Sequence, residues 1–167
     1  MEQYTELVNL AKQGDTQAFS RLYESCYKDL YRFALYNLGQ EEDAKDAVSD
    51  TVLAAFENIG KLRSADAFRS WIFRILVNQC MKRRRQYAQK TEELPETLQA
   101  RERDTCQEMD VRRAFAALSS EDRMIVSMAV FAGYNSSEIG KVLNKNANTV
   151  RSRLSRSMSK MQKLLEV

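Results

Sequence analysis

The sequence predicts an all-α protein of two small helical domains joined by a flexible acidic linker. Three observations support this prediction. The 167 residues include only five glycines and one proline, which leaves little material for the tight hairpins of a sheet. Apolar residues recur at three-and-four spacing along most of the chain. Residues 86–110 lose that period and carry seven acidic side chains against three basic ones. We place the N-terminal domain at 1–87, the linker at 88–108 and the C-terminal domain at 109–167.

The N-terminal domain is expected to hold four helices, of which the first two are marked by their ends. The first helix runs from about residue 2 to residue 12 and stops before Gly14, and Asp15 is placed to cap the second. The second helix continues to Gly39 with an apolar stripe at helical spacing. The residues of that stripe are Phe19, Leu22, Tyr23, Cys26, Leu30, Phe33 and Leu38.

The third helix is expected over about residues 41–58, with an apolar face and an acidic face. The residues expected to be buried are Val48, Val52, Ala55, Phe56 and Ile59. Asp43, Asp46 and Asp50 lie opposite, within about 60° of one another around the helix. They form a docking face for a basic partner, or else an ordinary solvated surface. Catalysis by these acids is not expected, because no apolar surroundings accompany them to raise a pKa.

The fourth helix is expected from about residue 66 and ends in four consecutive cations, residues 82–85. Its core residues are Phe68, Trp71, Ile72, Ile75 and Leu76. The basic run is typical of a solvated helix end, where cations favour the helix dipole. Four adjacent cations repel one another, however, and a phosphate backbone would relieve that repulsion. With Asn78 one turn earlier, the run indicates a contact with nucleic acid.

The C-terminal domain begins with a helix near Asp110. The apolar residues of this helix and of the one after it are Val111, Ala114, Phe115, Leu118, Met124, Ile125, Met128, Ala129 and Phe131. Ser119 or Ser120 is expected to cap the second of these helices, and Gly133 to end it.

Two short helices with a tight turn follow. Asn135 and Glu138 have the spacing of a capping box, Asn144 suits the left-handed turn position, and Asn146 is placed to cap the last helix. The last helix has an apolar stripe of Val150, Leu154, Met158, Met161 and Leu165.

The opposite side of the last helix is polar and basic, with Asn148, Ser152, Ser155, Arg156 and Ser159, flanked by Arg151 and Arg153. Residues 141–163 contain seven basic side chains and no acidic one. Because a merely solvated helix usually mixes charges of both signs, this pattern favours a recognition helix for the major groove of DNA.

Several classes of site are excluded by composition. The chain has no histidine, and its three cysteines are far apart, so we expect no metal site, no histidine-based catalysis and no cofactor. Scattered free cysteines suit a reducing cytosol. No signal peptide or membrane-spanning stretch is recognised, so a cytoplasmic protein without direct membrane insertion is expected.

Four segments in order along the chain resemble bacterial RNA polymerase sigma factors of the extracytoplasmic-function (ECF) group. They cover residues 14–23 (GDTQAFSRLY), 43–48 (DAKDAV), 71–78 (WIFRILVN) and 149–156 (TVRSRLSR). The resemblance implies that the first domain docks on the beta-prime clamp helices of core RNA polymerase and opens the minus-ten element of the promoter. It implies that the second domain reads the minus-thirty-five element, and that an anti-sigma factor is a further partner.

The resemblance also assigns residues to these roles. Polymerase docking falls to Asp43, Asp46, Ser49 and Asp50. Contacts to the minus-ten element fall to Asn58, Lys61, Arg63 and Ser64 in the loop, and to Asn78, Lys82 and Arg85 on the fourth helix. Contacts to the minus-thirty-five element fall to Asn148, Thr149, Arg151, Ser152, Ser155 and Arg156.

The expected function is therefore that of a non-enzymatic ECF-type sigma factor, which binds core polymerase and directs promoter-specific initiation without a small-molecule substrate. A stand-alone helix-turn-helix regulator is the alternative, and it would bind promoter DNA without polymerase. An adaptor that binds basic proteins through residues 43–50 is a weaker one. The net charge is −4 over residues 86–110 and +6 over residues 111–167. This asymmetry predicts a partly compact free protein whose DNA-reading face is occluded.

Overall fold

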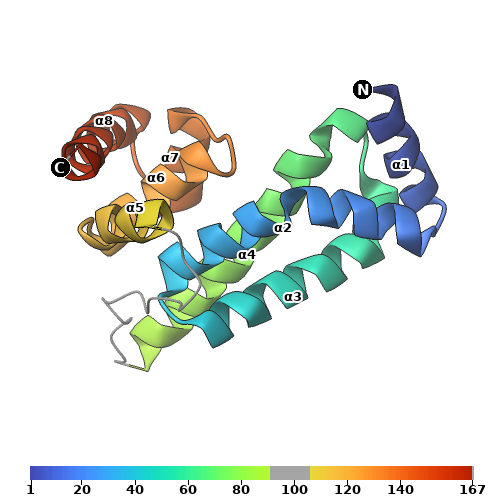
Figure 1. The fold of residues 1–167 in the computed structure, drawn as a ribbon, viewed down its shortest axis with the longest axis horizontal. Coiled ribbons are helices and arrows are strands. Elements are labelled where there is room, and N and C mark those ends of the chain that lie inside the picture. The colour runs from blue at the N-terminus through green and yellow to red at the C-terminus, as the bar shows by residue number, and fades with distance from the viewer. Residues whose placement is uncertain (91–105, 167) are drawn as a thin grey trace.

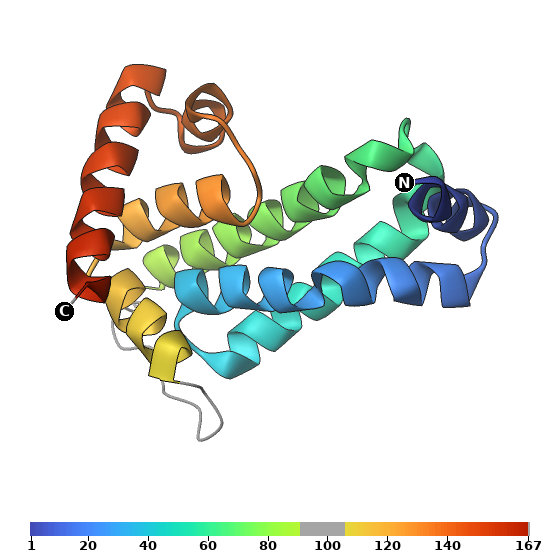
Figure 2. The ribbon, with the colours of Figure 1, turned by 45° about the horizontal axis from the view of Figure 1, so that its top comes forward.

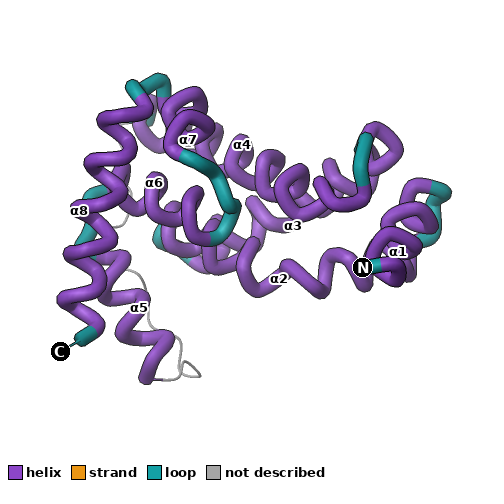
Figure 3. The backbone as a smooth tube through the Cα atoms, turned by 90° about the horizontal axis from the view of Figure 1, so that it is seen from above, coloured by secondary structure: helices purple, strands orange, loops and turns teal. Residues whose placement is uncertain are grey.

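A computed structural model describes residues 1–90 and 106–166, and every regular element in these ranges is helical (Figures 1 and 3). The first half contains α1 (Glu2–Lys12), α2 (Thr16–Leu38), α3 (Glu41–Asn58), two short 3₁₀ turns (Ile59–Lys61 and Ala65–Ala67) and α4 (Phe68–Gln89). The second half contains α5 (Cys106–Ala116), α6 (Ser120–Val130), α7 (Ser136–Leu143) and α8 (Ala147–Leu165). The all-α prediction is confirmed. Residues 91–105, on which most of the predicted linker falls, lie outside the described residues.

Local end signals account for most helix boundaries. The Asp15 carboxylate accepts a hydrogen bond from the Ala18 backbone N–H at 3.0 Å and begins α2, and Gly39 ends that helix in a left-handed conformation with φ of 81°. Ser119, one of the two expected caps, accepts from the Asp122 N–H at 3.1 Å and begins α6. These predictions are confirmed. Caps can be predicted from sequence because a cap depends on neighbours within about four residues.

Helices α2, α3 and α4 form the long body of the N-terminal half, and α1 packs on α2 (Figure 1). Its core contains the fully buried Leu22, Phe33, Phe68 and Phe73. The prediction for Phe56 was wrong, because this side chain is 40% exposed beside Phe19, with the two rings edge to face. Val52 is only half-buried. Both residues lie toward the α2 side of α3, where the two helices leave a groove rather than closing over them.

Helices α5 to α8 form the C-terminal half, with α8 lying across α5 and α6 at one end of the molecule and α1 at the other end (Figure 2). The predicted stripe of α8 was partly wrong. Val150 and Met161 are buried, but Met158 is 44% and Leu165 46% exposed, whereas Ser157 is buried. The helices that pack against α8 cover a narrower strip of it than the predicted apolar stripe, and the buried positions 150, 157 and 161 lie on that strip at helical spacing.

Two apolar clusters join the two halves of the chain. Met124, Ile125 and Met128 of α6 belong to the same buried cluster as the core residues of α2 and α4. Tyr36 of α2 stacks on Phe115 of α5, with ring centroids 4.4 Å apart. The last eight residues of α2, from Tyr31 to Leu38, include seven buried ones because the C-terminal half covers the side that α3 and α4 leave open.

Candidate nucleic-acid and protein interfaces

The predicted helix-turn-helix is formed by α7, the turn at residues 144–146, and α8. The Asn135 side chain accepts from the Glu138 N–H at 2.9 Å, while the Glu138 carboxylate accepts from the Asn135 N–H at 2.8 Å. Asn144 adopts the left-handed conformation with φ of 54°, and the Asn146 side chain accepts from the Asn148 N–H at 2.8 Å. The predicted capping box, turn residue and second cap are all confirmed.

The first turns of α8 present a polar face. The structure exposes all six predicted recognition residues: Asn148, Thr149, Arg151, Ser152, Ser155 and Arg156. Arg151 donates to the Asn148 side chain at 2.6 Å, and Arg156 donates to the Ser152 carbonyl at 3.4 Å. Among the described residues, the C-terminal half packs on α2 and α4 through α5 and α6 and leaves the start of α8 exposed. Most of the acidic linker expected to occlude this face lies outside the described residues, so the occlusion stays a prediction.

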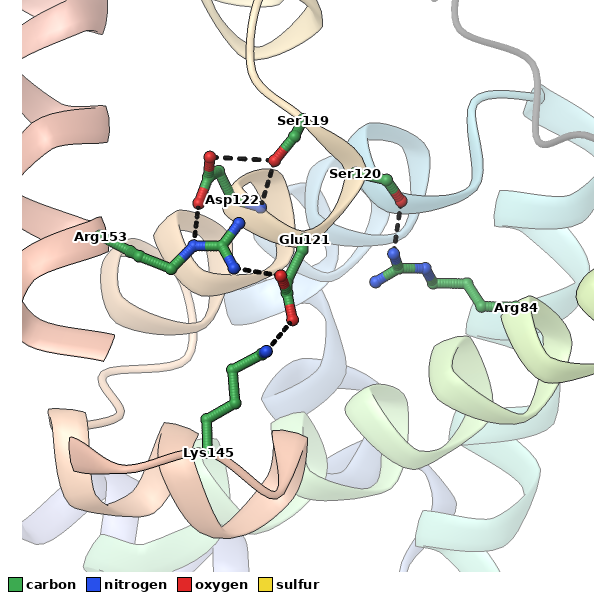
Figure 4. A network of polar contacts seen from close by, with 7 residues as sticks. All are labelled: Arg84, Ser119, Ser120, Glu121, Asp122, Lys145 and Arg153. Atoms are coloured by element: carbon green, nitrogen blue, oxygen red, sulfur yellow. Dashed lines mark hydrogen bonds and ion pairs between the residues drawn. The ribbon is translucent and has the colours of Figure 1, made fainter. Parts of the chain in front are cut away.

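Two other cations of this segment are held inside the protein instead. Arg153 pairs with both Glu121 and Asp122 at the start of α6, with a distance of 2.8 Å to the Asp122 Oδ1, and Lys145 lies 2.9 Å from the Glu121 Oε1 (Figure 4). We define these four residues as the α6 clasp. The clasp ties the turn and the recognition helix to α6. The basic pattern of the sequence alone cannot distinguish these structural cations from cations that contact DNA.

The α6 clasp perturbs the ionisation of its members. The hydrogen bond from Lys145, followed by that from Arg153, lowers the pKa of Glu121 although partial burial opposes this. Burial also disfavours the Asp122 carboxylate, but hydrogen bonds from Arg153 and Ser119 outweigh it and lower the pKa of Asp122. The hydrogen bond to Asp122 in turn raises the pKa of Arg153. Each acid is thus stabilised in its charged form by the clasp cations.

The predicted minus-ten residues lie in two places along α4. Asn78, Lys82 and Arg85 are exposed and share one side of the helix. Lys61, Arg63 and Ser64 are exposed in the loop that leads into α4, whereas Asn58 is half-buried and donates to the Ala54 carbonyl at 2.8 Å. The start of α4 and Arg85 are separated by roughly 25 Å of helix, at 1.5 Å per residue. The loop and the basic run therefore form two patches rather than one.

The four consecutive cations of α4 divide into two pairs. Lys82 and Arg85 are exposed, but Arg83 lies 2.6 Å from the Asp50 carboxylate and Arg84 donates to the Ser120 hydroxyl (Figure 4). Burial, followed by the neighbouring Arg123, lowers the pKa of Arg84. Asp50 thus relieves part of the repulsion within the run, in addition to the helix dipole and the phosphate contact considered from the sequence.

The acidic side of α3 is present as predicted, but its members differ in environment. Asp46, Ser49 and Asp50 are exposed, whereas Asp43 is half-buried and accepts a hydrogen bond from the Tyr87 hydroxyl. Asp50 accepts from Arg83, and Asp46 has no partner among the described residues. Two of the three aspartates are therefore also bonded to α4.

Two apolar grooves adjoin these faces. One lies between α2 and α3 and is lined by Phe19, Tyr23, Val52, Leu53 and Phe56, with Ser49 at its edge. The other is formed by α2, α5, α6 and α8 together, and its main apolar lining is Tyr36, Val111, Phe115, Val130, Phe131, Met158 and Met161. Residues from both halves of the chain are needed to build the second groove.

Within residues 1–90 and 106–166, no three histidine, cysteine or acidic side chains are grouped so as to hold a metal ion. None of the described helices is long and apolar enough to cross a membrane.

Family models match both halves of the chain. Sigma-70 region 2 matches residues 22–90, and sigma-70 region 4 matches residues 108–161. The chain is 32% identical over 163 residues to the ECF RNA polymerase sigma factor SigM of Mycobacterium tuberculosis, covering 96% of this chain and 83% of SigM. It is 28% identical over 174 residues to the RNA polymerase sigma factor NccH of Alcaligenes xylosoxydans xylosoxydans, covering 96% and 93%.

Two solved structures share the fold. CnrH in complex with the cytosolic domain of CnrY has a TM-score of 0.63 and 24% identity, covering 98% of this chain and 97% of that chain. The sigma factor RpoE in complex with the anti-sigma factor NepR, from Bartonella quintana, has a TM-score of 0.69 and 20% identity, covering 91% and 99%.

Proposed function

Because this chain belongs to the ECF group of RNA polymerase sigma factors, with sigma-70 regions 2 and 4, we propose that separate surfaces of α3, α4 and α8 divide the work of initiation. As a sigma factor it is a non-enzymatic subunit that binds core RNA polymerase and promoter DNA and directs promoter-specific initiation. We assign docking and minus-ten recognition to residues 1–87, and minus-thirty-five recognition to residues 109–167.

The first turns of α8 read the minus-thirty-five element in this proposal. The observation that carries it is the exposed polar face after the tight turn, which holds two arginines and four short polar side chains and no acid. Arginine suits guanine edges, and short polar side chains allow the helix to approach bases closely. The α6 clasp supports this role by holding α8 at a fixed angle on α6.

The exposed side of α4 and the loop before it contact the minus-ten element. Lys82 and Arg85 supply positive charge, and Asn78 supplies an amide that can pair with a base edge. The loop with Lys61, Arg63 and Ser64 precedes α4, whose start is separated from Asn78 by roughly 15 Å of helix and from Arg85 by roughly 25 Å. The loop is therefore suited to hold an unstacked base at a separate point of the same strand. Capture of unpaired bases at two points favours the melted promoter over the duplex.

The acidic side of α3 docks on the beta-prime clamp helices. Asp46 and Ser49 are exposed near the centre of this side, and the groove lined by Leu53 and Phe56 begins at Ser49. Exposed acids beside apolar side chains suit a basic, amphipathic helix as a partner.

An anti-sigma factor is the further partner that we propose. The solved RpoE structure is a complex with the anti-sigma factor NepR. In this chain, the groove built jointly by α2, α5, α6 and α8 offers a largely apolar lining with Arg32 and Glu108 among its polar residues. An amphipathic helix in that groove would hold the two halves together.

Transcription in vitro tests the proposal. We expect the protein, with core RNA polymerase, to give specific transcripts from a library of genomic fragments, and to bind the same fragments weakly without polymerase. Tight and specific binding of the protein alone, without transcript formation, would favour the stand-alone regulator instead.

Docking is tested by reversing one exposed charge. Asp46→Lys should weaken binding to core polymerase by about tenfold, since one well-placed charge contact at an interface is worth 1–3 kcal/mol. Glu6→Lys on α1 makes the same charge change away from α3 and serves as the control. If both variants bound core polymerase equally well, the α3 acids would be an ordinary solvated surface rather than a docking face.

A further inference from the structure

The last two turns of α4 extend beyond the apolar core. Cys80 is the final buried residue of this helix, although α4 continues to Gln89. Lys82 and Arg85, two of the proposed minus-ten contacts, lie in this extension. Figure 1 shows it running beside the first turns of α3. The turns that carry these two cations therefore have no buried apolar residue of their own to hold them.

Polar contacts hold the extension instead. The Tyr87 hydroxyl donates to the Asp43 carboxylate, and the Arg83 guanidinium donates to the Asp50 carboxylate at 2.6 Å. Arg83 and Tyr87 are one turn apart on α4, and Asp43 and Asp50 are two turns apart on α3. On another side of the same extension, Arg84 donates to the Ser120 hydroxyl.

The two contacts to α3 are placed to hold the orientation of the last two turns of α4. At about 100° per residue, Arg83 and Tyr87 lie roughly 130–170° from the side that carries Asn78, Lys82 and Arg85. Bonds on one side of a helix thus aim the opposite side at the DNA. The side chain of Arg83 is only 21% exposed, against 53% for Asp50, so the arginine is the more tightly enclosed partner.

We propose that Arg83 and Tyr87 are positioning residues that, anchored by Asp50 and Asp43, aim Lys82 and Arg85 at the melted minus-ten strand. The inference rests on the proposed function of α4. It gives Asp43 and Asp50 a role inside the protein and leaves Asp46 and Ser49 as the main polymerase contacts of α3. The side of α3 that meets polymerase and the helix that meets the melted strand are thereby joined through two side-chain bonds.

Hydrogen exchange on the free full-length protein tests the positioning step without polymerase or DNA. In Arg83→Gln and in Tyr87→Phe, amides of residues 81–89 should exchange about twofold to fivefold faster, the factor expected for losing one partly exposed pair or hydrogen bond. Residues 68–80 should not change, because their core packing is intact. Gln89→Ala, on the same extension but outside these contacts, should resemble the parent protein.

A charge exchange separates the intramolecular bond from docking. Asp50→Arg combined with Arg83→Asp rebuilds the pair in the opposite sense, and should restore the slow exchange of residues 81–89. Arg83→Lys should exchange more slowly than Arg83→Gln in residues 81–89 but faster than the parent protein, since lysine keeps the charge but not the planar guanidinium. Failure of every single variant to change exchange in this segment would overturn the proposal.

The functional step is measured in the holoenzyme at saturating core polymerase, on a promoter that the parent protein transcribes. Permanganate reactivity of unpaired thymines reports strand opening. Arg83→Gln and Tyr87→Phe should bind core polymerase like the parent but open the promoter several-fold less, and the charge exchange should recover opening. Normal promoter opening despite faster hydrogen exchange would overturn the positioning role, since the two contacts would then only stabilise the end of α4 locally. If no promoter were transcribed by the parent protein with core polymerase, the proposed function itself would instead be contradicted.

Discussion

Arg153 and Arg156 are three residues apart on α8 and have the same chemistry, but the structure gives them different roles. Arg153 belongs to the α6 clasp and is largely enclosed by Glu121 and Asp122. Arg156 is exposed and donates a hydrogen bond to the Ser152 carbonyl of its own helix. Substituting the first should lower stability, whereas substituting the second should affect recognition.

Removing Arg156 provides the first prediction. Arg156→Ala in the holoenzyme should cost about 1–3 kcal/mol of promoter binding if the guanidinium reads a base edge, because a good bidentate contact discriminates by that amount. Lys163→Ala, an exposed cation two turns further along, should change binding little. Fluorescence anisotropy with a labelled minus-thirty-five duplex measures both variants. Equal affinity of Arg156→Ala and the parent holoenzyme would remove this residue from the recognition face.

The α6 clasp predicts the pH dependence of stability. Because the pKa values of Glu121 and Asp122 are lowered in the folded protein, their contribution is fully present above the ordinary carboxyl pKa values of about 4 and is lost as pH falls through the lowered values. Urea denaturation at neutral pH and at pH values below about 4 should therefore show a loss of stability on acidification. Arg153→Gln should lessen that loss, whereas Lys141→Gln, an exposed cation outside the clasp, should not. An unchanged acid dependence in Arg153→Gln would contradict the assignment.

Among the elements, the helix-turn-helix has helix ends that local sequence signals predict, and one glycine whose role they do not predict. Its capping box and left-handed Asn144 follow from neighbouring residues. Gly140 has no such signal. A Cβ atom at this position would lie 2.6 Å from the Lys145 carbonyl oxygen, because the turn folds back onto α7. The Lys145 N–H also donates to the Gly140 carbonyl at 2.8 Å. The turn thus requires a residue without a side chain in α7.

This close approach gives the third prediction. Gly140→Ala should destabilise the protein by about 1–3 kcal/mol, the usual cost of forcing an extra methyl group into a packed site. Gly60→Ala is the matched control, since a Cβ there would meet nothing within 4 Å. Urea unfolding of the full chain measures both. Equal stability of Gly140→Ala and Gly60→Ala would contradict the claim that the turn requires glycine at position 140.

Across residues 1–90 and 106–166, the two halves pack on each other and leave the recognition face exposed. A buried hydrogen bond of 2.8 Å joins Asn37 of α2 to Ser127 of α6, next to the stack of Tyr36 on Phe115. Two promoter elements about 25 base pairs apart are separated by roughly 85 Å of duplex at 3.4 Å per base pair. Since α4 and α6 are in contact here, we expect the halves to separate when the holoenzyme engages both elements.

Small-angle scattering of the free protein tests the closed arrangement. The radius of gyration should be about 15 Å, as for a compact chain of this length, and should change little with salt because the interface is mainly apolar. This differs from the salt-sensitive closure that the charge asymmetry alone predicts. Tyr36→Ala should enlarge the particle, whereas Tyr27→Ala, an exposed tyrosine of the same helix, should not. A large radius of gyration in the parent protein would show that the halves do not close.

The sequence alone determined the helices, most of their ends and the polar side of α8, although α5 begins at Cys106, four residues before the expected start near Asp110. Each of these depends on residues within about one helical turn, such as Asp15 with Ala18 or Asn135 with Glu138, and on periodicity along one helix. The order of family motifs determined the sigma-factor identity for a similar reason, because motifs are read along the chain.

Only the tertiary structure decided which cations remain available for DNA and which are held by the protein. Arg83, Arg84 and Arg153 are as basic as Arg85 and Arg156, but their partners Asp50, Ser120 and Glu121 are more than thirty residues away. The same holds for Phe56 and Met158, which helical periodicity places in a core that no neighbouring helix completes. A sequence pattern describes one face of one helix. Whether that face is covered depends on which other helix packs against it, and distant contacts decide this.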